Sequence, residues 1–244
     1  MELLHSSWLE IEDYLKFSDG IIIPTGSIEQ HGPIGLIGTD TLCANDIATE
    51  AAQKINALVA PALAYAPAEF NMGFVGTASI SISVYRDFCI EVFRSFERHG
   101  FKHIYIMNGH GANLEPLRDA AGTLKSASVK IKSWWDFSLV AELRGQFYGS
   151  WEGMHATPSE VAITQTKHRT LKADLAKEPP EKLTPEFIKS HAGDKHGTAK
   201  EHRSQFPDGR VGSHSALARP EHGRQLKQAA VKALCMDYKA FINS

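Results

Sequence analysis

Cysteine is scarce in this sequence. Only three of the 244 residues are cysteines, Cys43, Cys89 and Cys235, and they lie far apart with no C-x-x-C spacing. An odd and scattered set argues against both a disulfide framework and a cysteine-based zinc site. Each of the three falls in a helix-like stretch, so we expect three buried free thiols.

An excess of charge and a long apolar run are also missing. Lys and Arg total 26 against 28 Asp and Glu, a formal net charge of −2, which gives no electrostatic case for a nucleic acid or an anionic membrane as partner. No segment approaches the roughly 18 apolar residues that span a bilayer. Residues 1–14 carry four acidic side chains and no apolar signal core. We therefore expect a soluble cytoplasmic protein.

Hydrophobic residues make up 43% of the sequence, which is enough for a sizeable core. The sequence has no internal repeat and no low-complexity linker. We expect a single domain over 1–244. The apolar patterns predict strands at 21–23, 58–60, 80–84, 102–107 and 129–134, and helices at 42–54, 85–99, 113–126, from 158, and 221–241. Strands alternating with helices predict an α/β fold, a mostly parallel sheet with helices on both faces in three α/β/α layers. Ligands of such folds bind beyond the carboxyl ends of the strands.

The first group of reactive side chains lies in a glycine-rich loop after a predicted strand. Glu29 and His31 are followed nine residues later by Asp40, with four glycines between 26 and 38. Three ionisable groups are costly to bury without compensation, which a divalent cation supplies. Imidazole together with carboxylate suits Zn, Mn or Fe. The alternative is an ordinary solvated polar loop.

Two more groups follow. His110 stands in a Gly-His-Gly turn after the strand at 102–107, where the alternative is a simple strand-to-helix turn with Asn113 as helix cap. His155 and Glu160 flank the predicted helix start at 158. Here the alternative is that Ser159 caps the helix and Glu160 is an ordinary acid of its first turn.

Together the three groups resemble the creatininase family, the creatinine amidohydrolases. The family pattern G-S-x-E-Q-H-G-P followed by an aspartate matches residues 26–33 and Asp40, N-G-H-G-x-N matches 108–113, and His-Ala followed by Glu matches His155 to Glu160. The resemblance covers about residues 1 to 240.

The resemblance implies a centre with two divalent metal ions per chain, Zn first and Mn or Fe as alternatives. By matching position, Asp40 bridges the ions, Glu29 and His110 complete one site, and His31 and Glu160 complete the other. His155 is the expected general acid and base, and Glu160 is expected to be a catalytic residue as well as a metal ligand. The family forms hexamers, so the resemblance also implies a homo-oligomer.

One departure separates the chain from creatininase proper, where a ligand glutamate lies two residues after the histidine of the second pattern. Here that position is Ala112, so Glu160 has to supply the ligand, which weakens creatinine as the substrate. Trp135, in a segment similar to the family's S-Y-W-D-F, and Trp151, four residues before His155, are candidates to bind a flat substrate. The alternative for both tryptophans is core packing.

We therefore expect hydrolysis of a non-peptide C–N bond in a small amide, cyclic or formyl-bearing. Creatinine ring opening, removal of a formyl group from a pyrimidine intermediate of flavin-type biosynthesis, and trimming of a modified peptide stay open. So does a reading of another class, a non-catalytic small-molecule-binding α/β protein. The polar segment 167–219 holds four histidines whose role stays open, in substrate binding or in a subunit contact: His191, His196, His202 and His214. We expect that most of them are not metal ligands.

Overall fold

The fold is built on one parallel sheet. The computed structural model describes residues 1–193 and 196–244. Within them, four strands, β1 (Gly20–Thr25), β2 (Leu58–Val59), β3 (His103–Asn108) and β4 (Ser128–Ser133), lie in the order β2-β1-β3-β4, and every pair is parallel. The predicted α/β fold with a parallel sheet is confirmed.

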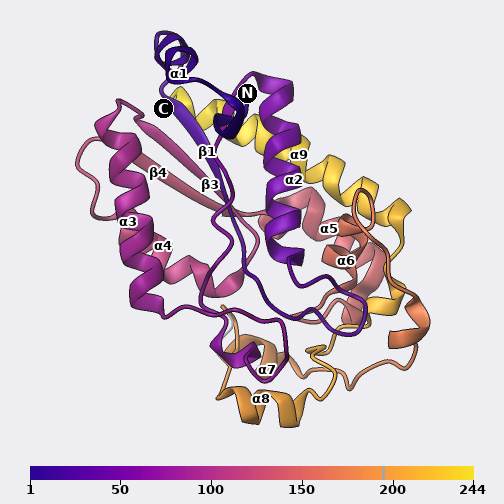
Figure 1. Cartoon of the computed structure of the whole chain (residues 1–244). Helices are drawn as coiled ribbons and strands as arrows, with labels where there is room; N and C mark the ends of the chain where they lie inside the picture. The colour runs from indigo at the N-terminus through magenta and orange to yellow at the C-terminus, as the bar shows by residue number, and fades with distance from the viewer. Residues whose placement is uncertain (194–195) are drawn as a thin grey trace.

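Helices cover both faces of the sheet, with α2 and α9 on one side and α3 and α4 on the other (Figure 1). The α-helices of the described residues are α1 (Trp8–Leu15), α2 (Thr39–Ile55), α3 (Ile82–Arg98), α4 (Leu114–Ala121), α5 (Ser138–Tyr148), α6 (Pro158–Thr164), α7 (Pro185–Ser190), α8 (Ala199–Gln205) and α9 (Pro220–Ile242). None of them is long and apolar enough to cross a membrane.

The core divides at the sheet because side chains alternate along each strand. Ile22 of β1 joins a buried cluster with α2, α5 and α9, whereas Ile21 and Ile23 join a second cluster with α3 and α4. All six residues of β1 are buried. Cys43 lies in the first cluster and Cys89 in the second, both as buried free thiols, while the free Cys235 is only half-buried, contrary to expectation.

The predicted strand at 80–84 is wrong. Ser81 is instead the N-cap of α3, with its hydroxyl accepting from the Val84 amide, and Ile82 and Val84 are exposed on the first helical turn. Their alternation with serines imitated a strand because a helix start also places apolar and polar residues in turn.

Two helix boundaries also differ from expectation. Helix α2 begins at Thr39 after Gly38, so Asp40 lies inside the first turn and does not cap it. Helix α4 ends at Ala121, before the predicted end at 126, and the Glu97 carboxylate accepts the backbone amides of 125–127 beyond it. Asn113 stands at the N-cap of α4, but its side chain donates to the Gly26 carbonyl instead of capping.

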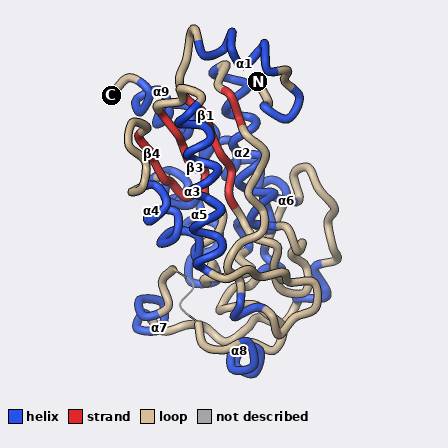
Figure 2. Tube along the Cα trace, turned by 60° about the vertical axis from the view of Figure 1, so that its left-hand side comes forward, coloured by secondary structure: helices blue, strands red, loops and turns tan. Residues whose placement is uncertain are grey.

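The sheet register aligns the two loops that carry the sequence patterns. Thr25, the last residue of β1, pairs with Asn108, the last residue of β3, and the Thr25 hydroxyl donates to the Asn108 side chain at 3.0 Å. The chain leaves both strands at the same carboxyl edge, as predicted. Helices α7 and α8 and the surrounding loops lie at the end of the molecule beyond this edge, away from both termini (Figure 2).

Candidate metal centre

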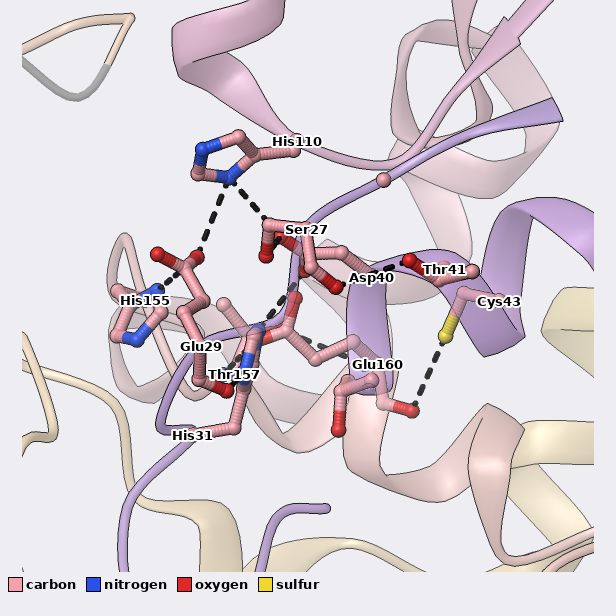
Figure 3. Close-up of polar contacts among 12 residues, drawn as sticks. Ser27, Glu29, His31, Asp40, Thr41, Cys43, His110, His155, Thr157 and Glu160 are labelled. Atoms are coloured by element: carbon pink, nitrogen blue, oxygen red, sulfur yellow. Dashed lines mark hydrogen bonds and ion pairs between the residues drawn. The ribbon is translucent and has the colours of Figure 1, made fainter. Parts of the chain in front are cut away.

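The five predicted ligands converge at the carboxyl edge of the sheet, and their side chains point toward one another (Figure 3). Glu29 and His31 come from the loop after β1, Asp40 from the first turn of α2, His110 from the turn after β3, and Glu160 from α6. All five are buried. The solvated-loop alternative is therefore wrong for this loop.

Asp40 stands at the centre of the group. Its Oδ1 lies 2.8 Å from His31 Nε2, and its Oδ2 lies 2.9 Å from His110 Nδ1. The Ser27 hydroxyl donates to Oδ2 at 2.9 Å. The first-turn position on α2 also favours a carboxylate, since the helix N-terminus carries partial positive charge.

The ligand atoms form two sets that share Asp40. Glu29, Asp40 and His110 make one set, in which each donor atom lies within 4.8 Å of the others, and His31, Asp40 and Glu160 make another. These are the two sets that the family resemblance implied. A third set, Glu29, His31 and His155, overlaps the first two and brings the expected acid–base histidine to the same place.

Glu160 combines its two predicted roles. Thr157, not Ser159, is the N-cap of α6, and Glu160 forms the reciprocal half of a capping box by accepting the Thr157 amide. The same Oε1 lies 3.9 Å from His31 Nε2. The capping box thus orients the carboxylate toward the other ligands, so the first-turn acid is also a candidate ligand.

Hydrogen bonds to backbone carbonyls orient all three imidazoles. His31 Nδ1 lies 3.1 Å from the Glu29 carbonyl, His110 Nε2 lies 2.7 Å from the Pro67 carbonyl, and His155 Nε2 lies 2.7 Å from the Gln30 carbonyl. A carbonyl only accepts, so each of these nitrogens carries a hydrogen. In a neutral ring the lone pair then sits on the other nitrogen, which faces the carboxylates, as in metal-binding histidines.

The charges of the group also call for a cation. Burial lowers the pKa of His31, but the carboxylates of Asp40, Glu160 and Glu29 outweigh it and raise that pKa to about 10. Burial likewise opposes charge on His110, yet Glu29 and Asp40 hold its pKa well above the usual range. Positive charge is therefore strongly favoured at both rings, and the donor set fits divalent cations.

His155 differs from the other two histidines. Burial, helped by the positive charge of His31, lowers its pKa well below the usual value, so the ring is neutral. Its Nδ1 lies 3.7 Å from Glu29 Oε1. Burial raises the pKa of the neighbouring Glu160 to about 8. A neutral imidazole with an oriented lone pair can accept a proton.

Sequence reasoning missed Asn71. This fully buried residue donates to Glu29 Oε2 at 2.9 Å and accepts from Gln30 Nε2 at 2.8 Å. It lies between two expected strands, in a stretch with no pattern that marks a site. Gln30 and Ser27 stand inside the recognised motif, and their chemistry could have been read there.

A small pocket opens on the ligands, with a volume of about 190 Å³. Its walls include Asp40, His110, His155 and Glu160, four glycines, the aromatic Trp134 and Trp135, and Arg144. Trp135 therefore lies where a substrate-binding residue was predicted. Trp151 does not line this pocket; its ring lies 5.6 Å from that of His214 and under the Lys182 ammonium.

The four histidines of the polar segment stand outside the ligand sets of the described residues. His202 is buried, with its ring 5.0 Å from that of Phe70, and burial lowers its pKa to about 4. His191 stacks on Phe187 at 3.7 Å. None of the sets that the described residues form includes these histidines, as expected for most of them.

A family model described as "Creatininase: Creatinine amidohydrolase" matches residues 4–237. The chain belongs to the creatininase family. It is a creatininase-family amidohydrolase, a hydrolase that acts on carbon–nitrogen bonds. The creatinine amidohydrolase of Pseudomonas putida is 26% identical over 176 residues, 64% of this chain and 68% of that protein.

Two further proteins are similar to this chain over shorter stretches. The 3-dehydro-scyllo-inosose hydrolase of Thermotoga maritima is 34% identical over 103 residues, and the mycofactocin precursor peptide peptidase of Mycolicibacterium smegmatis is 33% identical over 111 residues. These alignments cover 42% and 43% of this chain and only 33% and 44% of those proteins. The proteins to which this chain is similar therefore differ in the substrates that their names give.

Solved creatininases share the fold. A creatinine amidohydrolase structure superposes with a TM-score of 0.81 at 20% identity, covering 100% of this chain and 98% of that one. A manganese form of creatininase gives 0.80 at 20% identity, covering 100% and 99%. Another solved creatininase is described as a Zn–Zn type. At this identity the likeness concerns the fold.

Proposed function

We propose that this chain is a binuclear metal-dependent amidohydrolase that hydrolyses a non-peptide amide bond in a small molecule. The observation that supports it is the pair of ligand sets sharing Asp40, each with an imidazole nitrogen directed at the carboxylates. Glu29 and His110 would hold one ion, His31 and Glu160 the other, and Asp40 both. When bound, two divalent cations activate water and polarise the amide carbonyl.

In this mechanism His155 moves the proton. Its Nε2–H is held by the Gln30 carbonyl, so Nδ1 accepts a proton and then donates it to the leaving nitrogen. Burial keeps the ring neutral and ready to accept. Glu160, joined to the Thr157 amide, holds its carboxylate beside His31 and Asp40.

The substrate is a small amide, cyclic or formyl-bearing. The pocket of about 190 Å³ is below the roughly 300–1,000 Å³ of sites for drug-sized ligands. Trp135 on its wall would lie against a flat substrate, and Trp151, which lies outside this wall, is the second candidate to contact it. Ala112, at the position of a ligand glutamate of creatininase proper, favours a substrate other than creatinine.

The remaining expectations join this proposal: a single domain over 1–244, zinc as the first choice of metal with manganese or iron as alternatives, a cytoplasmic homohexamer, and no nucleic-acid or membrane partner. The near-neutral charge supports the last of these. Size-exclusion chromatography with light scattering tests the hexamer.

Asp40→Ala tests the metal centre. Because it removes the shared ligand, we expect the variant to lose both metals, measured by elemental analysis after reconstitution with zinc. The matched control is Asp46→Ala on the same helix, whose carboxylate pairs with Lys167 and His168 outside the pocket. The control should keep about two zinc ions per chain. An Asp40→Ala protein that also keeps two ions and full activity contradicts the assignment.

Elemental analysis of the wild-type protein also tests the alternative that the chain is a non-catalytic small-molecule-binding protein. A non-catalytic binding protein has no need of five buried metal-binding side chains, so a wild-type protein that binds no Zn, Mn or Fe would support that alternative. Reconstituted protein is then screened against creatinine, formamides, lactams and short peptides, and the hydrolysed class names the substrate.

A further inference from the structure

Arg144 of α5 lines the same pocket as the metal ligands, and the function proposed above gives it no role. The other residues that line this pocket include Trp134, Trp135 and the predicted ligands Asp40, His110 and Glu160. The side chain is 21% exposed, so the guanidinium is largely withdrawn from bulk water. A charge held in that position interacts more strongly with a ligand than one on the surface.

Only the Nε atom of the guanidinium donates a hydrogen bond within the described residues, so Nη1 and Nη2 are available to a ligand. Nε donates to Glu152 Oε1 at 2.8 Å, and the Cζ atom lies 5.7 Å from the centre of the Trp134 ring. Glu152 Oε2 receives no hydrogen bond, so Nη1 and Nη2 do not use it. Among residues 1–193 and 196–244, none accepts a hydrogen bond from either Nη atom. The pair of amino groups that recognises planar anions is therefore available.

Glu152 fixes Arg144 relative to the metal ligands. The Ser159 hydroxyl donates to the same Glu152 Oε1 that Arg144 uses, and it also lies 3.1 Å from the Thr157 hydroxyl. Thr157 is the cap that orients Glu160. A continuous set of hydrogen bonds thus joins the guanidinium to one ligand of the centre, so its position is preset and costs little ordering when a ligand binds.

We propose that Arg144 is a specificity residue that binds a carboxylate group of the substrate, so that the preferred substrate is a small flat amide carrying an anionic substituent. The amide lies over the metal ligands, the ring against Trp135, and the carboxylate on the Nη groups of Arg144. This inference rests on the proposed amidohydrolase function, which supplies the reacting end of the substrate. A neutral substrate would leave both Nη groups without a hydrogen-bond acceptor, although Nε stays paired with Glu152.

Two matched ligands test the proposal, 4-formamidobenzoate and formanilide, which differ only by a carboxylate. Binding to zinc-loaded protein is measured by calorimetry in a His155→Ala background, which suppresses turnover. We expect the carboxylate ligand to bind more tightly than formanilide. Arg144→Ala should lower the affinity for 4-formamidobenzoate roughly 10- to 100-fold more than the affinity for formanilide, which is the range expected of a charge-assisted bidentate contact. Arg144→Lys, which keeps the charge but not the planar pair, should recover only part of this loss.

Arg86→Ala is the control, because Arg86 is exposed on α3 and pairs with Asp87 away from the pocket. This variant should leave the affinity for both ligands unchanged. Equal effects of Arg144→Ala on both ligands, or no binding of the carboxylate ligand by the parent protein, overturn the proposal and leave Arg144 as a structural partner of Glu152. Zinc content and turnover are measured separately: selective binding through Arg144 without hydrolysis of any amide would contradict the proposed function and not this inference.

Discussion

Replacing Asn71 by alanine is expected to disturb both the stability of the protein and its metal centre, although Asn71 is not a proposed ligand. The side chain is fully buried, and its amide nitrogen donates to Glu29 Oε2 while its oxygen accepts from Gln30. Alanine removes both hydrogen bonds, together with the 3.3 Å contact of Asn71 Nδ2 with His155 Nε2. The Glu29 carboxylate then loses a partner that holds it toward His110.

The magnitude follows from these two bonds. A hydrogen bond to a charged group contributes about 1.5–3 kcal/mol and a neutral one about 0.5–1.5 kcal/mol. Gln30 Nε2 keeps its second acceptor, the Gly209 carbonyl at 3.0 Å. The loss of its hydrogen bond to Asn71 should therefore cost a free energy at the low end of the neutral range. We expect Asn71→Ala to lower the free energy of unfolding by about 2–4 kcal/mol.

Urea denaturation of the metal-free protein measures this change without a contribution from the ion, and zinc titration of the folded variant measures the effect on Glu29 as a ligand. Asn243→Ala is the control: that exposed amide donates to the Lys239 carbonyl near the C-terminus, and its loss should stay within about 0.5 kcal/mol. An Asn71→Ala protein with unchanged unfolding and unchanged zinc affinity would refute the role given to this residue.

Three further outcomes are expected. His155→Ala should keep both metals but lose turnover roughly 10²- to 10⁴-fold, and unchanged turnover would remove it from the mechanism. Gly109→Ala should cost about 1–3 kcal/mol of stability and weaken metal binding, because its Cβ would lie 2.3 Å from the Asp40 carbonyl oxygen, whereas Gly145→Ala has open space and should be neutral or stabilising in thermal melts. Zinc uptake at pH 7 should release protons, because the raised pKa of His31, about 10, leaves that ring protonated before the metal displaces the proton. Affinity then rises with pH, and calorimetry in buffers of different ionisation enthalpy that detects no proton release would contradict this.

How far the fold could be predicted depended on how local each signal is. The sequence predicted a strand at 21–23 from a short β-branched apolar run, and these residues lie within the fully buried strand Gly20–Thr25. The segment around Ser81 failed because alternation of apolar and polar residues over five positions fits both a strand and a capped helix start. Which one forms is decided by packing of α3 on the sheet, which is not a local property.

The site was predictable for a similar reason at its two motif loops. Glu29, His31 and His110 follow strands whose carboxyl ends share an edge in any parallel sheet, so their meeting required only the correct strand order. The role of Glu160 was harder to predict, because one carboxylate both caps α6 and lies beside His31. Spacing alone could not separate them.

The sequence by itself thus determined the ligand types, the family and the α/β class, because those depend on residue identity and on the order of motifs along the chain. Only the tertiary structure decided which nitrogen of each imidazole faces the carboxylates, that Asn71 supports Glu29, and that Arg144 shares the pocket with the ligands. Apart from the contact of His31 with the Glu29 carbonyl, these features join segments far apart in the chain. Their spacing in sequence carries no signal, since the hydrogen bonds and the pocket wall exist only after the sheet edge has assembled.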